Sequence, residues 1–127
     1  MFNDKDERKI MLSEKNEIGF KHDLYDKLLG KNERVLMEFM SQRNVLVFTD
    51  EKIIAIRIEA YTAKHKAGLC IPYSSISAYS AEVSLNKDMD TEIKVWIPGI
   101  DSVTFTFLED TAPMRDNIAI LVEKEKK

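Results

Sequence analysis

The amino-acid sequence predicts a mainly β (α+β) domain in which seven short antiparallel strands lie between an N-terminal and a C-terminal helix. The hydrophobic period changes from helical to alternating after residue 30, and it stays alternating, with polar turns, to about residue 108. It becomes helical again near the C-terminus. The 127 residues are enough for one buried core. We therefore expect a flexible N-terminus over residues 1–12 and a single domain over residues 13–127.

The first expected helix covers residues 13–30. Ser13 suits the N-cap, and Gly30 suits the end of the helix. Phe20, Leu24 and Leu28 recur every four residues. This spacing predicts one apolar face that packs on the rest of the domain.

The strands are expected within residues 34–108, and a closing helix over residues 112–125. The individual strand ranges are 34–40, 45–48, 53–58, 68–73, 76–83, 91–97 and 102–107. The last two strands alternate most cleanly, which predicts that one side of each points into the core. Those inward residues are Ile93, Val95, Ile97, Val103, Phe105 and Phe107.

The segment NVLVFTDEKIIAIR, residues 44–57, predicts a hairpin whose strands are apolar on both faces. Pairing across Asp50 and Glu51 places opposite residues on one face. The two resulting sets are Val45, Val47, Ile54 and Ile56, and Leu46, Phe48, Ile53 and Ala55. We assign the first set to the interior of a barrel and the second set to its outside, as a candidate interface, and the reverse assignment of the two faces stays open.

Two covers for that outer set remain open. The N-terminal helix could fold over it within the chain, or another subunit could cover it. Trp96 also points outward by alternation, and it either anchors an interface or packs beneath a terminal helix.

Three motifs resemble the bacterial pleckstrin-homology (PH) domain family, in its short single-domain form. They are VFTDEKIIAI, IPYSSI, and AEV followed by DMDTEIKVWI, and the resemblance covers roughly residues 25 to 122. It implies a PH-like seven-stranded barrel with a C-terminal capping helix, no enzyme chemistry, and assembly into closed homo-oligomers. The chain departs from the family pattern at YTAKHKAG, residues 61–68, and at Arg43-Asn44, where the family commonly has Arg-Asp.

The residues give little sign of catalysis. The chain has two histidines and one cysteine, and Cys70 lies in an apolar strand, where we expect a buried structural thiol. No glycine-rich phosphate loop is present. Asp88, Asp90 and Glu92 are spaced like a calcium loop, but Ile93 and Gly99 stand where such a loop needs glycine and glutamate, so we interpret them as solvated carboxylates. We expect no enzyme, no cofactor and no metal.

A small group of basic residues is the second candidate site. Lys64, His65 and Lys66 lie together, with Arg57 nearby in sequence and Arg43 in the turn before the hairpin. One or two arginines can bind a phosphate, although membrane recruitment needs a denser positive surface. An ordinary charged loop is the plainer interpretation.

The sequence thus supports a non-catalytic module that self-assembles and mediates protein interactions. The alternative is an adaptor or membrane-surface module that binds an anionic headgroup or a peptide. The net charge of -3 gives no reason to expect nucleic acid as a partner. We expect a homo-oligomer, with another protein as a further possible partner and a membrane as a weaker one. A charged N-terminus and a lone cysteine predict a cytoplasmic location.

Overall fold

The computed structural model describes residues 9–58, 66–82, 90–99 and 101–108. In these ranges the chain forms nine strands, one α-helix and two 3-10 helices. The strands are β1 (Lys9–Leu12), β2 (Glu14–Asn16), β3 (Val35–Met40), β4 (Asn44–Thr49), β5 (Lys52–Ile58), β6 (Lys66–Pro72), β7 (Ala78–Glu82), β8 (Thr91–Ile97) and β9 (Asp101–Phe107). The helices are α1 (His22–Tyr25), η1 (Asp26–Leu28) and η2 (Tyr73–Ser75).

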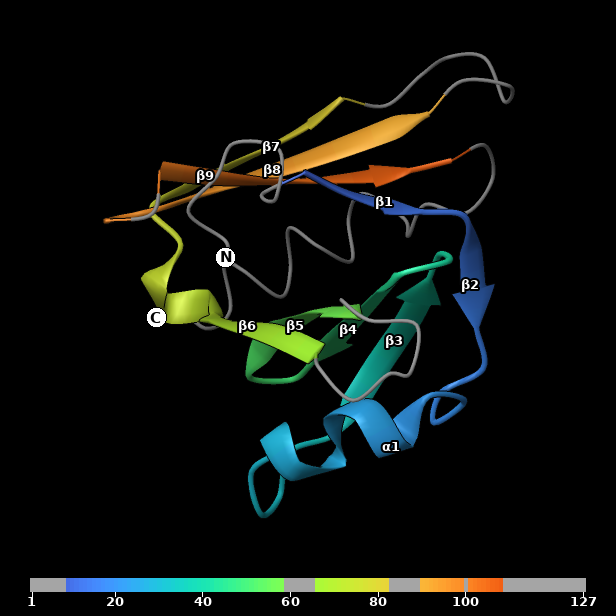
Figure 1. Cartoon of the computed structure of the whole chain (residues 1–127). Helices are drawn as coiled ribbons and strands as arrows, with labels where there is room; N and C mark the ends of the chain where they lie inside the picture. Colours follow the sequence, from blue (N-terminus) through green and yellow to red (C-terminus); the bar gives the residue numbers. More distant parts are fainter. Residues whose placement is uncertain (1–8, 59–65, 83–89, 100, 109–127) are drawn as a thin grey trace.

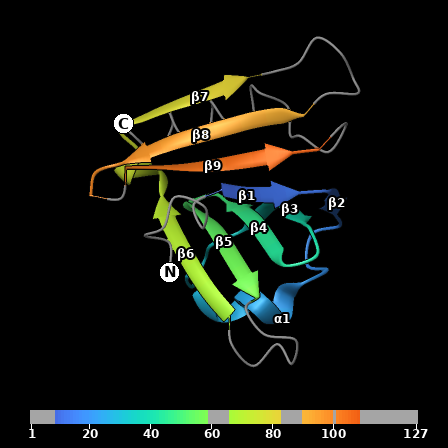
Figure 2. The same cartoon turned by 45° about the horizontal axis from the view of Figure 1, so that its top comes forward.

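The strands form two sheets that pack face to face. One sheet has the order β1-β9-β8-β7 and the other β2-β3-β4-β5-β6. Figure 1 shows the first sheet above the second, with α1 beneath the second sheet. Figure 2 shows that the strands of the two sheets run in clearly different directions. The five-stranded sheet is therefore covered on both faces, which explains why its hairpin is apolar on both faces.

The main core lies between the two sheets. Phe39 on β3 contacts the rings of Phe48 on β4 and Phe107 on β9 edge to face, with centroid distances of 5.9 and 5.1 Å. Such aromatic contacts add to the burial of apolar area. The inward sides of β8 and β9 are buried as their alternation predicts.

The β4–β5 hairpin has the expected register, but the assignment of its two faces was wrong. Phe48 pairs with Ile53 and Val45 with Ile56, as predicted. The set proposed for the outside, Leu46, Phe48, Ile53 and Ala55, lies in the core between the sheets and is at most 1% exposed. The β-branched set forms a second cluster with Tyr25, bordered by Leu24 and Leu29. The segment that contains α1 therefore covers the second face within the same chain.

The predicted helix over residues 13–30 was also wrong. Residues 9–12 form a strand that pairs in parallel with β9, and residues 14–16 form one that pairs with β3. Ser13 lies between the two strands and caps no helix, and the α-helix is limited to residues 22–25. The fourfold spacing was misleading, because Phe20 is 61% exposed and the buried residue of this segment is Tyr25.

A buried carboxylate explains why this segment is a turn instead of a long helix. Glu38 on β3 is 0% exposed and points to the α1 side of the sheet. It accepts hydrogen bonds from the Asn16 side chain (2.7 Å), the Gly19 and Lys21 amides (3.3 and 3.0 Å) and the Tyr25 hydroxyl. Gly19 has φ +94°, a conformation that glycine adopts without strain. These contacts fix residues 16–21 in a compact turn that a regular helix could not satisfy.

The two family-like motifs TDEK and IPY meet at the other end of the hairpin. The Thr49 hydroxyl accepts hydrogen bonds from the Glu51 and Lys52 amides (3.0 and 2.9 Å), and it donates to Glu33. Lys52 forms an ion pair with Glu33 at 2.8 Å, and the Tyr73 hydroxyl donates to the Thr49 carbonyl at 2.7 Å. These residues stabilise the turn, so the motifs have a structural role here.

The expected strand ranges 34–40 through 102–107 correspond to β3 to β9, but the expected total of seven is wrong because β1 and β2 precede them. Pro72 ends β6, and Gly99 lies in the turn between β8 and β9 with φ +88°. The expected closing helix over residues 112–125 lies outside the described residues.

Candidate anion-binding site

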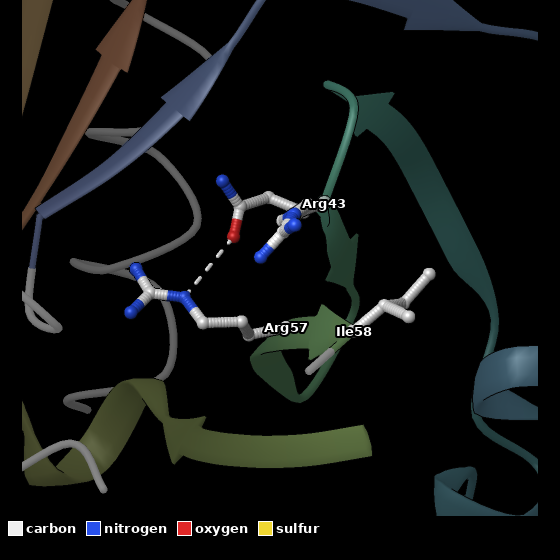
Figure 3. Close-up of a pocket in the computed structure, with 4 residues that line it drawn as sticks. Arg43, Arg57 and Ile58 are labelled. Atoms are coloured by element: carbon white, nitrogen blue, oxygen red, sulfur yellow. Dashed lines mark hydrogen bonds between the residues drawn. The ribbon is translucent and has the colours of Figure 1, made fainter. Parts of the chain in front are cut away.

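Two of the predicted basic residues line one pocket at the end of the β4–β5 hairpin. The pocket has a volume of about 410 Å³ and is lined by Arg43, Asn44, Arg57 and Ile58. Arg43 belongs to the turn between β3 and β4, and Arg57 lies near the end of β5. Figure 3 shows their side chains on the same side of the strands, while Ile58 extends to the other side.

Backbone pairing brings these residues together. Asn44 is the register partner of Arg57, and the Ile58 amide donates to the Arg43 carbonyl at 2.8 Å. The 13 residues between the two arginines form most of the hairpin, so its closure places both guanidinium groups at its open end. This juxtaposition follows from the strand register and does not depend on a long flexible loop.

Strand β1 borders the pocket through its main chain. Arg57 Nη2 donates to the Lys9 carbonyl at 3.2 Å, and Asn44 Nδ2 donates to the Met11 carbonyl at 3.4 Å. Arg57 Nε donates to Asn44 Oδ1 at 3.5 Å, which Figure 3 shows as a dashed line. The Arg57 guanidinium is thus held between β1 and β4, and the polar groups at this edge connect the two sheets.

The rest of the predicted basic group is placed only in part. Lys66 is the register partner of Ile58, so its backbone lies beside the pocket. Lys64 and His65 lie outside the described residues. Sequence reasoning missed Asn44, although the predicted hairpin register, extended by one pair, would have placed it opposite Arg57.

The predicted interface residues are not gathered on a surface. Leu46, Phe48, Ile53 and Ala55 are core residues, so they cannot form the proposed contact between subunits without unfolding. Trp96 is half-buried on β8, and its ring lies 5.6 Å from Lys94 Nζ. Cys70 is exposed, which corrects the expectation of a buried thiol.

Three groups at α1 lie close enough to share a cation. His22 Nδ1 is 2.7 Å from Asp26 Oδ2 and 3.3 Å from Asp23 Oδ1, and all three residues are exposed. The hydrogen bond to Asp26 and the charges of both carboxylates raise the pKa of His22. His22, Asp23 and Asp26 thus form a local cluster of ion pairs. Asp90 and Glu92 are exposed, and Asp88 lies outside the described residues.

The comparisons with known proteins identify the family. The sequence profile of the bacterial PH domain family matches residues 6–122, and the chain belongs to this family. Among curated proteins, the uncharacterized protein YjqA of Bacillus subtilis (strain 168) is 36% identical over 74 residues. That match covers 58% of this chain and 59% of YjqA, so less than two thirds of the relative is represented.

Solved structures show the same fold. A protein with a pleckstrin-homology domain from Shewanella loihica PV-4 matches with a TM-score of 0.70 and 22% identity, over 90% of this chain and 97% of that one. A pleckstrin homology domain from Shewanella amazonensis SB2B matches with a TM-score of 0.63 and 24% identity, over 90% and 91% of the two chains. At these identities the likeness shows the fold alone. Among the described residues, no helix is long and apolar enough to cross a membrane.

Proposed function

We propose that this chain is a non-catalytic PH-like module that binds a phosphate-bearing anion in the pocket between Arg43 and Arg57. The observation that supports this function is the position of two guanidinium groups, from different elements, on one pocket of about 410 Å³. Arginine favours phosphate because its planar group can donate two parallel hydrogen bonds. The pocket is large enough for a phosphate group and part of the molecule that carries it.

Calorimetry with sodium pyrophosphate as the probe tests this function at low and moderate salt. Arg43→Gln and Arg57→Gln should each weaken binding by about tenfold or more, because a hydrogen bond to a charged group contributes about 1.5–3 kcal/mol. Arg34→Gln is the matched control. It removes the same charge at the opposite end of the hairpin, where Arg34 is 81% exposed and lies near Asp50.

A second arm of the experiment distinguishes the source of the phosphate. Vesicles of phosphatidylcholine with and without phosphatidic acid are sedimented with the protein. Binding to both pyrophosphate and the acidic vesicles indicates a lipid headgroup, whereas binding to pyrophosphate alone indicates a soluble phosphate compound. If Arg43→Gln and Arg57→Gln bound pyrophosphate with the same affinity as the control Arg34→Gln, the proposed site would be contradicted.

Self-assembly is the second candidate function, and a different surface favours it. The turn that Glu38 holds presents Ile18 and Phe20, which are 60% and 61% exposed. A fixed turn with two large apolar side chains would lose little conformational entropy on binding, so it suits contact with a second copy of this chain.

Light scattering on a gel-filtered sample at micromolar concentration tests self-assembly. The wild type should give the mass of an oligomer, several times 14.7 kDa, and Phe20→Asp should lower this mass. Lys31→Asp, at another exposed position, should leave the mass unchanged. A monomeric wild type, or an oligomer that persists in Phe20→Asp, would count against this surface.

A further inference from the structure

Side chains of the five-stranded sheet hold one edge of β1. β1 pairs with β9 along its other edge, where the Leu12 carbonyl accepts a main-chain amide at 3.0 Å. The backbone groups of successive residues point to opposite edges of a strand, so the Lys9 and Met11 carbonyls point away from β9. The Lys9 carbonyl accepts from Arg57 Nη2 at 3.2 Å, and the Met11 carbonyl accepts from Asn44 Nδ2 at 3.4 Å.

We propose that β1 is a latch that an anion in the pocket loosens, because the anion competes with the two β1 carbonyls for the donors of Arg57 and Asn44. This inference rests on the proposed function, since both side chains line the proposed pocket. It uses Arg57 as a group that is already engaged with the main chain of β1. A charged phosphate oxygen forms a stronger hydrogen bond with a guanidinium than a neutral carbonyl does, so the competition favours the anion.

The structure of β1 allows it to open without the rest of the sheet. β1 has four residues, and it lies at the edge of its sheet. The Ser13 amide donates to the Met40 carbonyl at 2.9 Å, directly before β2 pairs with β3. β1 can therefore detach as far as Ser13 while β2 remains paired. Pairing with β9 and the burial of Ile10 and Leu12, which are 2% and 0% exposed, oppose this opening.

Linkage gives the direction of the effect and its consequence. An anion that binds the open form better than the closed form raises the fraction of molecules in which β1 is detached. Opening uncovers the edge of β9 and the part of the core that Ile10 and Leu12 cover. Anion binding would thus be converted into an exposed strand edge with apolar side chains beside it.

Hydrogen exchange of the main-chain amides of β1, followed by NMR on the full chain, tests the latch. We expect saturating sodium pyrophosphate to speed this exchange by about threefold to tenfold relative to sodium chloride at the same ionic strength, because the net contribution of a hydrogen bond is about 0.5–1.5 kcal/mol. Amides in the centre of β8 should exchange at the same rate or more slowly. Exchange in β1 that is unchanged or slower at saturating pyrophosphate would overturn the latch.

Variants test the two contacts without any ligand. Asn44→Ala and Arg57→Met each remove one donor to β1, so each should speed the exchange of the β1 amides by a similar factor. Arg34→Met is the matched control, because it makes the same substitution at the opposite end of the hairpin and should leave β1 exchange unchanged. Circular dichroism and the melting temperature establish that each variant is folded. Wild-type exchange rates in both pocket variants would overturn the role of these donors.

The two measurements separate this inference from the proposed function. A wild type that binds no pyrophosphate in calorimetry overturns the proposed function and, with it, the opening of β1 by an anion. A wild type that binds pyrophosphate without faster exchange in β1 overturns the latch alone and leaves the proposed function in place.

Discussion

Two buried glutamates decide how separate segments are held on the five-stranded sheet. Glu38 fixes the turn at residues 16–21, and Glu33 joins the turn before β3 to the hairpin end through Lys52 and Thr49. Burial by itself would raise the pKa of Glu33, but the Gly30 amide, Lys52 and Thr49 together lower it. Burial, and then the hydrogen bond to Glu38, raise the pKa of Tyr25, so its hydroxyl remains a donor.

Glu38→Gln should lower the free energy of unfolding by about 1–3 kcal/mol. Each carboxylate oxygen of Glu38 accepts from two donors, and glutamine would turn one oxygen into an NH2 group that faces donors. Urea unfolding measures the change. Glu92→Gln, on an exposed site of β8, is the control and should change stability little. A Glu38→Gln protein as stable as the control would contradict the anchoring role.

At the scale of elements, the segment from α1 to η1 is short but covers an apolar face of the sheet. Tyr25 is 1% exposed and packs against the cluster of Val45, Val47, Ile54 and Ile56. Four residues of α-helix have little stability of their own. The segment therefore depends on this burial and on local ionic contacts such as that between His22 and Asp26.

The pH dependence of His22 reports on those contacts. Its pKa in the folded protein is raised above the ordinary 6.5, first by the hydrogen bond to Asp26 and then by the charge of Asp23. The stability that results is fully present below pH 6.5 and is lost as the pH rises through the raised folded value. NMR titration should give a pKa above 6.5 that falls in Asp26→Asn. A value that does not respond to Asp26→Asn would refute the contact.

At the scale of the whole molecule, one aromatic cluster joins the two sheets. Phe39 and Phe48 belong to the five-stranded sheet and Phe107 to the four-stranded sheet, and all three are 0% exposed. Because this cluster connects both layers, loss of its central ring should weaken the whole fold and not one edge.

Phe39→Ala should lower the free energy of unfolding by about 3–5 kcal/mol, the usual cost of removing a buried aromatic ring. Chemical unfolding followed by fluorescence and by circular dichroism should show one shifted transition. Phe20→Ala removes the same group from a site that is 61% exposed, and it should change stability by about 0.5 kcal/mol or less. Similar losses in the two variants would show that Phe39 has no special role in the core.

The sequence predicted the alternating strands well and the N-terminal segment poorly. β8 and β9 alternate along one buried face, so period and exposure agree. In the N-terminal segment the fourfold spacing of Phe20, Leu24 and Leu28 matched a helix. The segment instead forms a turn, because the Gly19 and Lys21 amides bind Glu38, which lies 19 and 17 residues further along the chain. The alternation of Ile10 and Leu12 is too short to predict a strand from the sequence. These residues form β1 because they pair with β9.

For the candidate site, the sequence identified Arg43 and Arg57 as basic residues but did not show that they share a pocket. The register of the hairpin could be predicted from the sequence, because two antiparallel strands joined by a short turn have few possible pairings. The contact between β1 and Arg57 could not be predicted from the sequence, because Arg57 and Lys9 are far apart along the chain.

By itself, the sequence determined the mainly β class, the positions of β3 to β9, the hairpin register and the family motifs, because these depend on local periodicity and turn chemistry. Only the tertiary structure decided which face of the hairpin lies between the sheets. Both faces are equally apolar, so composition cannot distinguish the one that meets the second sheet from the one that meets α1. That choice depends on contacts between residues distant in sequence, and it places Arg57 and Asn44 at the edge of the inter-sheet core, beside β1.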